Sequence, residues 1–322
     1  GSPTPAEAGT FSDAVSVPVP AGLSGVFNLN NANVVPMDID GDGRSDMLHM
    51  PRVARYEYFT PVRNGDADAT RPSQQGWQFA YVDVNLPRDV TDPRIDLGRD
   101  GTHIRAFDVN NDHLIDIVRT TGTVMQTWLN LGWLPGGDGR FGSYRYLAGS
   151  DSYELSTAPY ESCLLHSGTA IDFDDPEVQL ADMNGDGIQD IVQMRRGRIR
   201  YWPGRGLGLW GVGPSSCDRG EGAGRYVEMT TAPPEINAEL SGVYLHDVNH
   251  DGASDVVQVR FDEVDVWFNE AGRGFTPRTI LSRTPAAPAF APRVRFVDID
   301  GSGTTDIVFG NAGRYEWVDP MG

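Results

Sequence analysis

The stretch Asp182-Met-Asn-Gly-Asp-Gly-Ile-Gln-Asp190 decides the fold, because similar nine-residue acidic segments occur four more times along the chain. In every copy, positions 1 and 9 are aspartate, position 3 is aspartate or asparagine, and position 5 is aspartate or serine. The copies start 70, 74, 65 and 51 residues apart, a period typical of the blades of a β-propeller. We call them loops 1 to 5, and they span residues 38–46, 108–116, 182–190, 247–255 and 298–306.

The segments on either side of these loops predict β-strands. Val178-Gln-Leu-Ala-Asp-Met183 and Val294-Arg-Phe-Val-Asp-Ile299 show the short apolar or alternating patterns of strands. After loop 3, Arg196-Gly197 separates two further strand-like runs and predicts a hairpin turn. The sequence contains no long run with apolar residues at the helical spacing i, i+3, i+4 and i+7. The chain is therefore predicted to be all-β.

An aromatic residue recurs at a nearly fixed distance after each loop begins. The distance is 20 residues in the first four units and 19 in the last, which gives Tyr58, Trp128, Trp202, Trp267 and Trp317. A recurring position of this kind favours packing between blades over stacking against sugars.

These patterns predict one β-propeller domain over residues 1–322, with five blades, or six if a degenerate blade lies within 46–108 or 190–247. Residues 1–10 are expected to form a disordered terminus. The last unit ends soon after its aromatic strand, so Ala14-Val-Ser-Val-Pro-Val-Pro20 is a candidate for the outer strand that closes the ring. The two cysteines, Cys163 and Cys217, allow either one disulfide or two separate buried thiols.

Composition excludes several classes of function. The chain has 45 acidic and 26 basic residues, a formal net charge of -19, and no lysine. This charge opposes binding to nucleic acid and to anionic membranes. A phosphate-binding lysine loop and a Schiff-base lysine are impossible without lysine, and the Gly-x-Ser-x-Gly and His-Glu-x-x-His motifs are absent. The sequence therefore predicts a protein that is not an enzyme.

The acidic loops have the ligand chemistry of calcium, which takes six to eight oxygen ligands. Positions 1, 3, 5 and 9 offer side-chain oxygens, position 7 offers its backbone carbonyl, and glycine at position 6 permits a tight turn. The sequence therefore predicts up to five Ca²⁺ sites. The expected ligands are Asp38, Asp40, Asp42, Arg44 and Asp46 in loop 1; Asp108, Asn110, Asp112, Leu114 and Asp116 in loop 2; Asp182, Asn184, Asp186, Ile188 and Asp190 in loop 3; Asp247, Asn249, Asp251, Ala253 and Asp255 in loop 4; and Asp298, Asp300, Ser302, Thr304 and Asp306 in loop 5.

Two alternatives apply to these loops. An EF-hand requires a glutamate at position 12 and flanking helices, but position 12 is never glutamate here, so an EF-hand is rejected. The second alternative is that the loops are metal-free turns in which side chains cap their own backbone. Loops 2 and 5 are expected to bind calcium more weakly, because His113 replaces the glycine and Ser302 replaces the aspartate at position 5.

Three other features favour ordinary structural roles. The cluster Asp172, Asp174, Asp175 and Glu177 is interpreted as a solvated acidic loop. A group of arginines on the hairpin after loop 3 is interpreted as a solvated face; it comprises Arg195, Arg196, Arg198 and Arg200. Gly206-Leu-Gly-Leu-Trp-Gly211 matches a nucleotide-binding pattern, but it follows an aromatic strand and is interpreted as a turn.

The chain resembles known repeat families. The Asp-x-Asx-x-Asp-Gly-x-x-Asp loops between strands are similar to the FG-GAP or VCBS-type repeats of integrin α-subunit propellers. Leu180-Ala-Asp-Met-Asn-Gly-Asp-Gly-Ile-Gln-Asp-Ile-Val192, Arg200-Tyr-Trp-Pro-Gly204 and Val294–Val308 resemble the middle region of the B component of tripartite bacterial Tc insecticidal toxins and its SpvB-like neighbours. This second likeness is strongest over residues 178–318. The only residues to which this resemblance assigns a role are the loop aspartates, which it implies are metal ligands.

The resemblance implies a secreted docking and gating module of a toxin or Rhs-like assembly. Its expected partner is a pore-forming toxin component or neighbouring domains of a larger chain. A secreted adhesion propeller of the integrin or lectin kind, which binds carbohydrate, is a second interpretation, and a calcium-dependent polysaccharide-degrading enzyme is a third. All three predict the same fold, because a fold does not fix function.

Overall fold

The structure is a computed structural model of the chain. It describes residues 27–52, 55–63, 77–82, 103–132, 134–137, 140–164, 171–195, 197–213, 224–234, 236, 242–260, 263–281, 284, 294–311 and 314–321. These residues form strands and turns, and no α-helix occurs among them, which confirms the all-β prediction. No helix able to span a membrane is found in this part of the chain.

The strands form five antiparallel sheets that follow one another along the chain. The first is β1 (Val34–Met37), β2 (Asp46–Arg52), β3 (Arg55–Arg63) and β4 (Trp77–Val82); the second is β5 (Ile104–Phe107), β6 (Asp116–Thr121), β7 (Val124–Asn130), β8 (Phe141–Leu147), β9 (Ser152–Ser156) and β10 (Tyr160–Cys163), which pairs with β7; the third is β11 (Val178–Ala181), β12 (Asp190–Arg195), β13 (Arg198–Trp202) and β14 (Val227–Glu228); the fourth is β15 (Val243–His246), β16 (Asp255–Val259), β17 (Val264–Trp267) and β18 (Thr279–Leu281); and the fifth is β19 (Val294–Val297), β20 (Asp306–Asn311) and β21 (Arg314–Val318).

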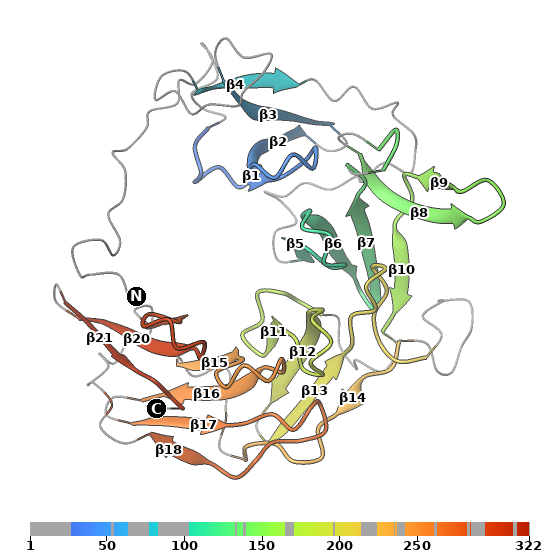
Figure 1. Cartoon of the computed structure of the whole chain (residues 1–322). Coiled ribbons are helices and arrows are strands. Elements are labelled where there is room, and N and C mark those ends of the chain that lie inside the picture. The colour runs from blue at the N-terminus through green and yellow to red at the C-terminus, as the bar shows by residue number, and fades with distance from the viewer. Residues whose placement is uncertain are drawn as a thin grey trace.

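The five sheets are the blades of a β-propeller. They stand around a ring, and the first strands of the blades, such as β5 and β11, lie nearest its centre (Figure 1). Each acidic loop joins the first strand of a blade to the second, and its position 9 begins the second strand. The prediction of a five-bladed propeller is therefore confirmed, and the described residues contain no sixth sheet.

Apolar side chains fill the spaces between neighbouring blades. Trp128, Trp202 and Trp267 each lie across the strand pair from the apolar residue that follows position 9 of their loop. Each tryptophan is buried in a cluster that joins its own blade to the preceding blade. Packing between blades, the role predicted for them, is confirmed for these three residues.

The aromatic register fails in the first and last blades. The residues that occupy the structural position of the three tryptophans are Phe59 and Val318, one place beyond Tyr58 and Trp317. In the first blade, an irregularity in the pairing of β2 with β3 adds the extra residue. Tyr58 is still buried, but Trp317 is 44% exposed, so the prediction that Trp317 packs between blades is wrong.

Several predictions on the chain termini and the cysteines concern residues outside the described part. These are the disordered terminus 1–10 and the ring-closing strand 14–20. Cys163, at the end of β10, is buried and disulfide-bonded. Cys217, the other cysteine of the sequence, lies outside the described residues.

Candidate functional site

Each acidic loop is held in shape by hydrogen bonds from its own backbone to its own side chains. In loop 3, Asp182 accepts the backbone N–H groups of Gly185 at 2.8 Å and Gly187 at 2.7 Å. In all five loops, positions 4 and 6 have positive φ, whichever residue occupies them. These contacts fold each short acidic segment into a tight turn.

Loop 2 shows that glycine is not essential at position 6. His113 takes a φ of 70°, and its backbone N–H donates to Asp108 at 2.9 Å, as the glycines of the other loops do. The backbone of loop 2 therefore follows that of the other loops at this position, at a steric cost to the histidine.

We expect His113→Gly to raise the free energy of unfolding by about 0.5–1 kcal/mol. A left-handed conformation costs a residue with a Cβ about 1–2 kcal/mol. The greater conformational entropy of glycine in the unfolded chain offsets about 0.4–1 kcal/mol of the stability gained by removing that cost. Urea-induced unfolding of both proteins measures the difference. His113→Ala is the control and should bring no such gain; a loss of stability in His113→Gly would contradict the strained backbone.

The aspartate at position 9 clamps the blade in loops 2, 3 and 4. Asp190 is fully buried, and its two carboxylate oxygens accept the backbone N–H groups of Met183 at 2.9 Å and Gly204 at 2.8 Å. Asp116 and Asp255 make the same pair of contacts in their own blades. Each of these carboxylates therefore ties the start of its acidic loop to the chain beyond the third strand of the blade.

Burial has the largest effect on the pKa values of these position 9 carboxylates. It raises the pKa of Asp190 and of Asp255 to about 7, although the two backbone N–H donors act in the opposite direction. The pKa of Asp116 is raised well above its ordinary value for the same reason.

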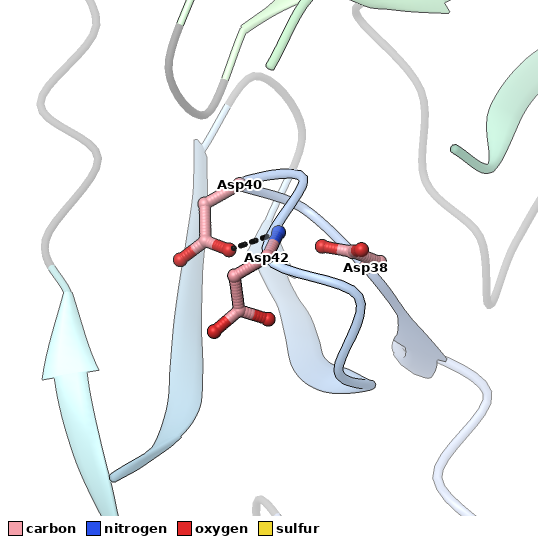
Figure 2. Close-up of side chains that lie close together, drawn as sticks. All are labelled: Asp38, Asp40 and Asp42. Carbon is pink, nitrogen blue, oxygen red and sulfur yellow. Dashed lines mark hydrogen bonds between the residues drawn. The ribbon is translucent and has the colours of Figure 1, made fainter. Parts of the chain in front are cut away.

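Loops 1 and 5 differ from the others because three carboxylates converge in each. The groups are Asp38, Asp40 and Asp42 in loop 1, and Asp298, Asp300 and Asp306 in loop 5, each with one oxygen per residue lying within 4.8 Å of the others. Figure 2 shows the loop 1 carboxylates gathered around the turn. In this part of the chain, no other three residues of the types His, Cys, Asp and Glu converge in this way.

Negative charge in loop 1 is compensated only in part, by Arg44, which pairs with Asp42 at 3.1 Å. The pKa of Asp40 is raised by burial and then by the negative charges of Asp42 and Asp38. Among the described residues, Oδ1 of Asp306, at position 9 of loop 5, is buried without a hydrogen-bond partner, and so is Oδ1 of Asp247, at position 1 of loop 4. Buried polar atoms are normally paired, so each of these oxygens has an unused capacity to accept.

Loops 2, 3 and 4 relieve the same crowding internally. Asparagine replaces aspartate at position 3, and its side-chain amide donates to the aspartate at position 5. In loop 3, Asn184 donates to Asp186 at 3.0 Å, and the corresponding bonds in loops 2 and 4 are 2.9 and 3.0 Å long. The position 3 side chain therefore stabilises the neighbouring carboxylate through a hydrogen bond, which the aspartate at position 3 of loop 1 cannot donate.

The geometry of loops 1 and 5 fits a hard cation. Calcium binds oxygen at 2.3–2.6 Å, so two of its ligands lie no more than about 5 Å apart. The convergent carboxylates meet this limit; in loop 5 they include Asp306 at position 9, whereas in loop 1 the position 9 residue, Asp46, lies outside the convergent group. The distinction between the two classes of loop was not predicted, although aspartate or asparagine at position 3 was the signal for it.

Neighbouring loops contact one another along most of the series. Three contacts join loops 2 to 3, 3 to 4 and 4 to 5 in turn: Asn111 Nδ2 to the Gly187 carbonyl at 2.6 Å, Ser254 N to the Asp182 carbonyl at 2.7 Å, and His250 Nε2 with Thr305 Oγ1 at 2.8 Å. Loop 1 is joined to the second blade through the end of β7, where Asn130 Nδ2 donates to the Asp38 carbonyl at 2.9 Å. The five loops together form an acidic rim on the propeller.

Two buried asparagines strengthen these contacts. Asn130 and Asn269 each follow a tryptophan by two residues, and the repeated Trp-x-Asn was a signal that the sequence interpretation missed. Asn269 donates to the carbonyls of Met183 in loop 3 and Ser254 in loop 4, at 2.9 and 3.0 Å.

The other clusters in the sequence are explained by local structure. Asp174 pairs with Arg105 at 2.8 Å and Glu177 pairs with Arg195 at 2.7 Å. Arg198 pairs with Glu228 at 2.6 Å. Arg200 is buried and lies over the Trp202 ring, so the prediction that it faces solvent is wrong. Arg196 lies outside the described residues. The Gly206–Gly211 segment opens no helix and forms a bend, as predicted.

The comparisons with known proteins agree with this architecture. The family of FG-GAP-like repeats matches residues 247–309, which cover loops 4 and 5 with their strands. No curated protein matches the sequence. The predicted resemblance to FG-GAP-repeat propellers is confirmed.

Solved structures with a similar fold include toxin complexes and a lectin. The Photorhabdus luminescens Tc holotoxin pore is 17% identical with a TM-score of 0.39, and the match covers 88% of this chain and 14% of that one. The TcdB2–TccC3–Cdc42 complex is 16% identical with a TM-score of 0.38, and the match covers 88% of this chain and 14% of that one. An Agrocybe aegerita lectin that recognises non-reducing terminal N-acetylglucosamine gives 17% identity, a TM-score of 0.51, and coverage of 87% and 61%. The chain thus spans about one seventh of the toxin chains and 61% of the lectin chain.

Proposed function

We propose that this chain is a non-catalytic binding propeller that docks a protein partner in a secreted toxin or Rhs-like assembly. The observation that carries the proposal is the acidic rim, in which hydrogen bonds join loops 2 to 5 to one another and loop 1 to the second blade. A rim fixed in this way presents many exposed side chains on a rigid support, as a docking surface requires. The FG-GAP-like repeat and the resemblance of residues 178–318 to the Tc B component support the same function. The disulfide at Cys163 supports an extracellular location.

Binding measurements test this function directly. The purified chain is presented to an immobilised pore-forming Tc component and, in parallel, to a glycan array, both in millimolar calcium. Saturable binding to the protein component with no preferred glycan is the expected result. Saturable binding to glycans alone would replace docking by the lectin interpretation, and release of sugars from a polysaccharide would replace it by the enzyme interpretation.

We further propose that calcium stabilises the rim, with loops 1 and 5 as its principal sites; the convergence of Asp298, Asp300 and Asp306 reverses the weaker binding expected of loop 5 from Ser302. The ligands in loop 1 would be Asp38, Asp40 and Asp42, and those in loop 5 would be Asp298, Asp300 and Asp306, with backbone carbonyls at position 7. A bound cation would neutralise carboxylates that otherwise repel one another. Loops 2, 3 and 4 would bind calcium more weakly, because their asparagines already satisfy the carboxylate at position 5.

A reciprocal pair of substitutions tests the two classes of loop. Asp40→Asn gives loop 1 the pattern of loop 3, and we expect it to raise stability in EDTA by about 0.5–1 kcal/mol, the contribution of one ordinary hydrogen bond. It should also remove the part of the calcium stabilisation that loop 1 supplies. Asn184→Asp makes loop 3 resemble loop 1 and should lower stability in EDTA by a similar amount but increase the response to calcium.

The measurement is urea-induced unfolding of the wild type and both variants, in EDTA and in calcium. Asp174→Asn, in an exposed turn outside the acidic loops, is the matched control and should respond to calcium as the wild type does. If both loop variants respond to calcium as the wild type does, the assignment of position 3 as the selector is wrong.

A further inference from the structure

The fifth blade has one strand fewer than the first, third and fourth blades. Within the described residues, β19, β20 and β21 form a three-stranded sheet, whereas each of those three blades has a fourth strand that pairs with its third. In this part of the chain, no strand lies along the outer edge of β21. An open edge beside apolar surface invites pairing with another chain, so proteins normally cover it.

One face of the fifth blade is also exposed where the other blades are covered. Ile299, at position 2 of loop 5, is 48% exposed, but the residues at position 2 of the other loops are at most 2% exposed: Ile39, Val109, Met183 and Val248. Trp317 is 44% exposed, but its counterparts in strand register are at most 6% exposed: Tyr58, Thr127, Tyr201 and Val266. We call this surface the open face of the fifth blade, formed by Val297, Ile299, Tyr315 and Trp317.

The backbone of β21 determines which of its groups point to the open edge. Asn311 and Arg314 are paired across only two residues, and in so short a turn the second of the pair donates its N–H to the first. Arg314 therefore turns its N–H towards β20. Because alternate residues of a strand turn their N–H and C=O groups to opposite sides, those of Tyr315 and Trp317 point to the open edge.

The third blade shows what covers the same face when a fourth strand is present. There Tyr201 holds the place of Trp317, and Val227 of β14 lies opposite it. Two residues further on, Met229 donates its N–H to the carbonyl of Ile199 at 3.0 Å. Val227 and Met229 both pack in the cluster that joins the third blade to the fourth. The covering chain thus places an apolar side chain on this face at every second residue.

Residues 14–20 have the sequence pattern of such a strand. After Ala14, valine alternates with serine or proline: Val15, Ser16, Val17, Pro18, Val19 and Pro20. Proline has no N–H, so an edge strand accommodates it where its nitrogen faces away from the sheet. The valines then turn their N–H groups towards β21, and their side chains lie on the face of the residues to which they bond. Because those residues are Tyr315 and Trp317, the valines lie on the open face.

The described chain begins where this segment would have to enter. The ring of Phe27 lies 5.0 Å from that of Phe59 and 4.8 Å from that of Phe79. These rings cover the face of the first blade that corresponds to the faces by which later blades pack on the blade before them. The fifth blade is the neighbour on that side of the ring (Figure 1). Val19 precedes Phe27 by eight residues, which extend over about 26 Å, against about 10 Å between packed sheets.

We infer that residues 14–20 form the fourth strand of the fifth blade, antiparallel to β21, with the three valines covering its open face. The inference is independent of the proposed docking function. The strand pairs the outward backbone groups of Tyr315 and Trp317 and links the first blade to the fifth. This chain is a better occupant than a second copy, because a second copy brings a further net charge of -19, whereas a tethered segment is present at high effective concentration.

Amide hydrogen exchange, measured residue by residue by NMR on the whole chain in calcium, tests the inference. The amides of Glu316 and Val318 face β20 and serve as the internal reference. In the wild type, the amides of Tyr315 and Trp317 should be protected together with these two. Without a fourth strand they would face solvent and exchange rapidly.

Val17→Asp and Ser16→Asp form a matched pair, because each adds one negative charge but only position 17 lies on the open face. Val17→Asp should speed exchange of the Tyr315 and Trp317 amides about 10- to 100-fold, the loss expected for one buried valine side chain, while the two reference amides stay protected. Ser16→Asp should leave all four within about twofold of the wild type. Val17→Ser should act on the same two amides by a smaller factor, which keeps the test valid if Val17→Asp loosens the whole blade.

Three results would overturn the inference. The first is rapid exchange of the Tyr315 and Trp317 amides in the wild type. The second is an equal effect of Val17→Asp and Ser16→Asp. The third is protection that rises with protein concentration together with a dimer in analytical ultracentrifugation, which would assign the edge of β21 to a second copy.

Discussion

Asp190→Ala is expected to lower the free energy of unfolding by about 2–6 kcal/mol, in EDTA and in calcium alike. The substitution leaves the backbone N–H groups of Met183 and Gly204 buried without an acceptor, and each such group costs about 1–3 kcal/mol. The loss should not depend on calcium, because the carboxylate holds the blade together through these two bonds. Urea-induced unfolding in both conditions measures it.

Asp186→Ala, four residues earlier in the same loop, is the matched control. Asp186 is exposed, and its carboxylate serves only the turn itself. We expect it to cost about 1 kcal/mol or less, since it removes ordinary exposed hydrogen bonds. Equal losses at positions 186 and 190 would show that the position 9 aspartate has no special structural role.

The same carboxylate makes stability depend on pH. Burial raises the pKa of Asp190 to about 7 in the folded chain, so the folded state holds its proton over a range in which the unfolded chain has released it. The contribution of Asp190 is therefore fully present below about pH 4 and is lost as the pH rises towards 7. Asp190→Asn, which does not titrate, should show a smaller fall in stability between pH 5 and pH 7 than the wild type; an equal fall would contradict the raised pKa.

Asn269→Asp is the second large effect and should lower the free energy of unfolding by about 2–5 kcal/mol. The side-chain amide of Asn269 donates to the carbonyls of Met183 and Ser254. A carboxylate in its place cannot donate, so the two carbonyl oxygens lose their hydrogen bonds. The negative charge of the carboxylate also repels these oxygens. The variant therefore weakens the link between the third and fourth blades, and thermal or urea unfolding detects the loss.

Asn130→Asp provides the comparison in the second blade. Asn130 donates to a single carbonyl of a neighbouring blade, that of Asp38, through a less deeply buried bond. We expect a smaller loss, about 1–3 kcal/mol. If Asn130→Asp proves the more damaging of the two, the assignment of Asn269 as the stronger link between blades is wrong.

The fold could be predicted from the sequence because one strong signal repeats five times. The aspartates at positions 1 and 9 of each loop fix where the first strand ends and the second begins, and the observed strands β2, β6, β12, β16 and β20 all start at position 9. Blade number and strand order follow from that register. The failure at Trp317 has a simple physical cause: a side chain only alternates between faces along a strand, so one residue of slippage moves it to the other face.

The candidate site was less predictable, because its decisive features are contacts between units. The acidic side chains of each loop can be identified within a single segment of sequence, but the bonds from Asn130 to loop 1 and from Asn269 to loop 3 depend on how blades stand beside one another.

Calorimetric titration of calcium into the EDTA-treated, dialysed chain tests the central claim, that the acidic rim is held by cations at loops 1 and 5. The account predicts two tight sites, one of which disappears in Asp40→Asn, and weaker binding by the remaining loops. Absence of calcium binding would show that the loops are metal-free turns. Five equivalent sites would show that asparagine at position 3 does not distinguish the loops, and either result would contradict the account.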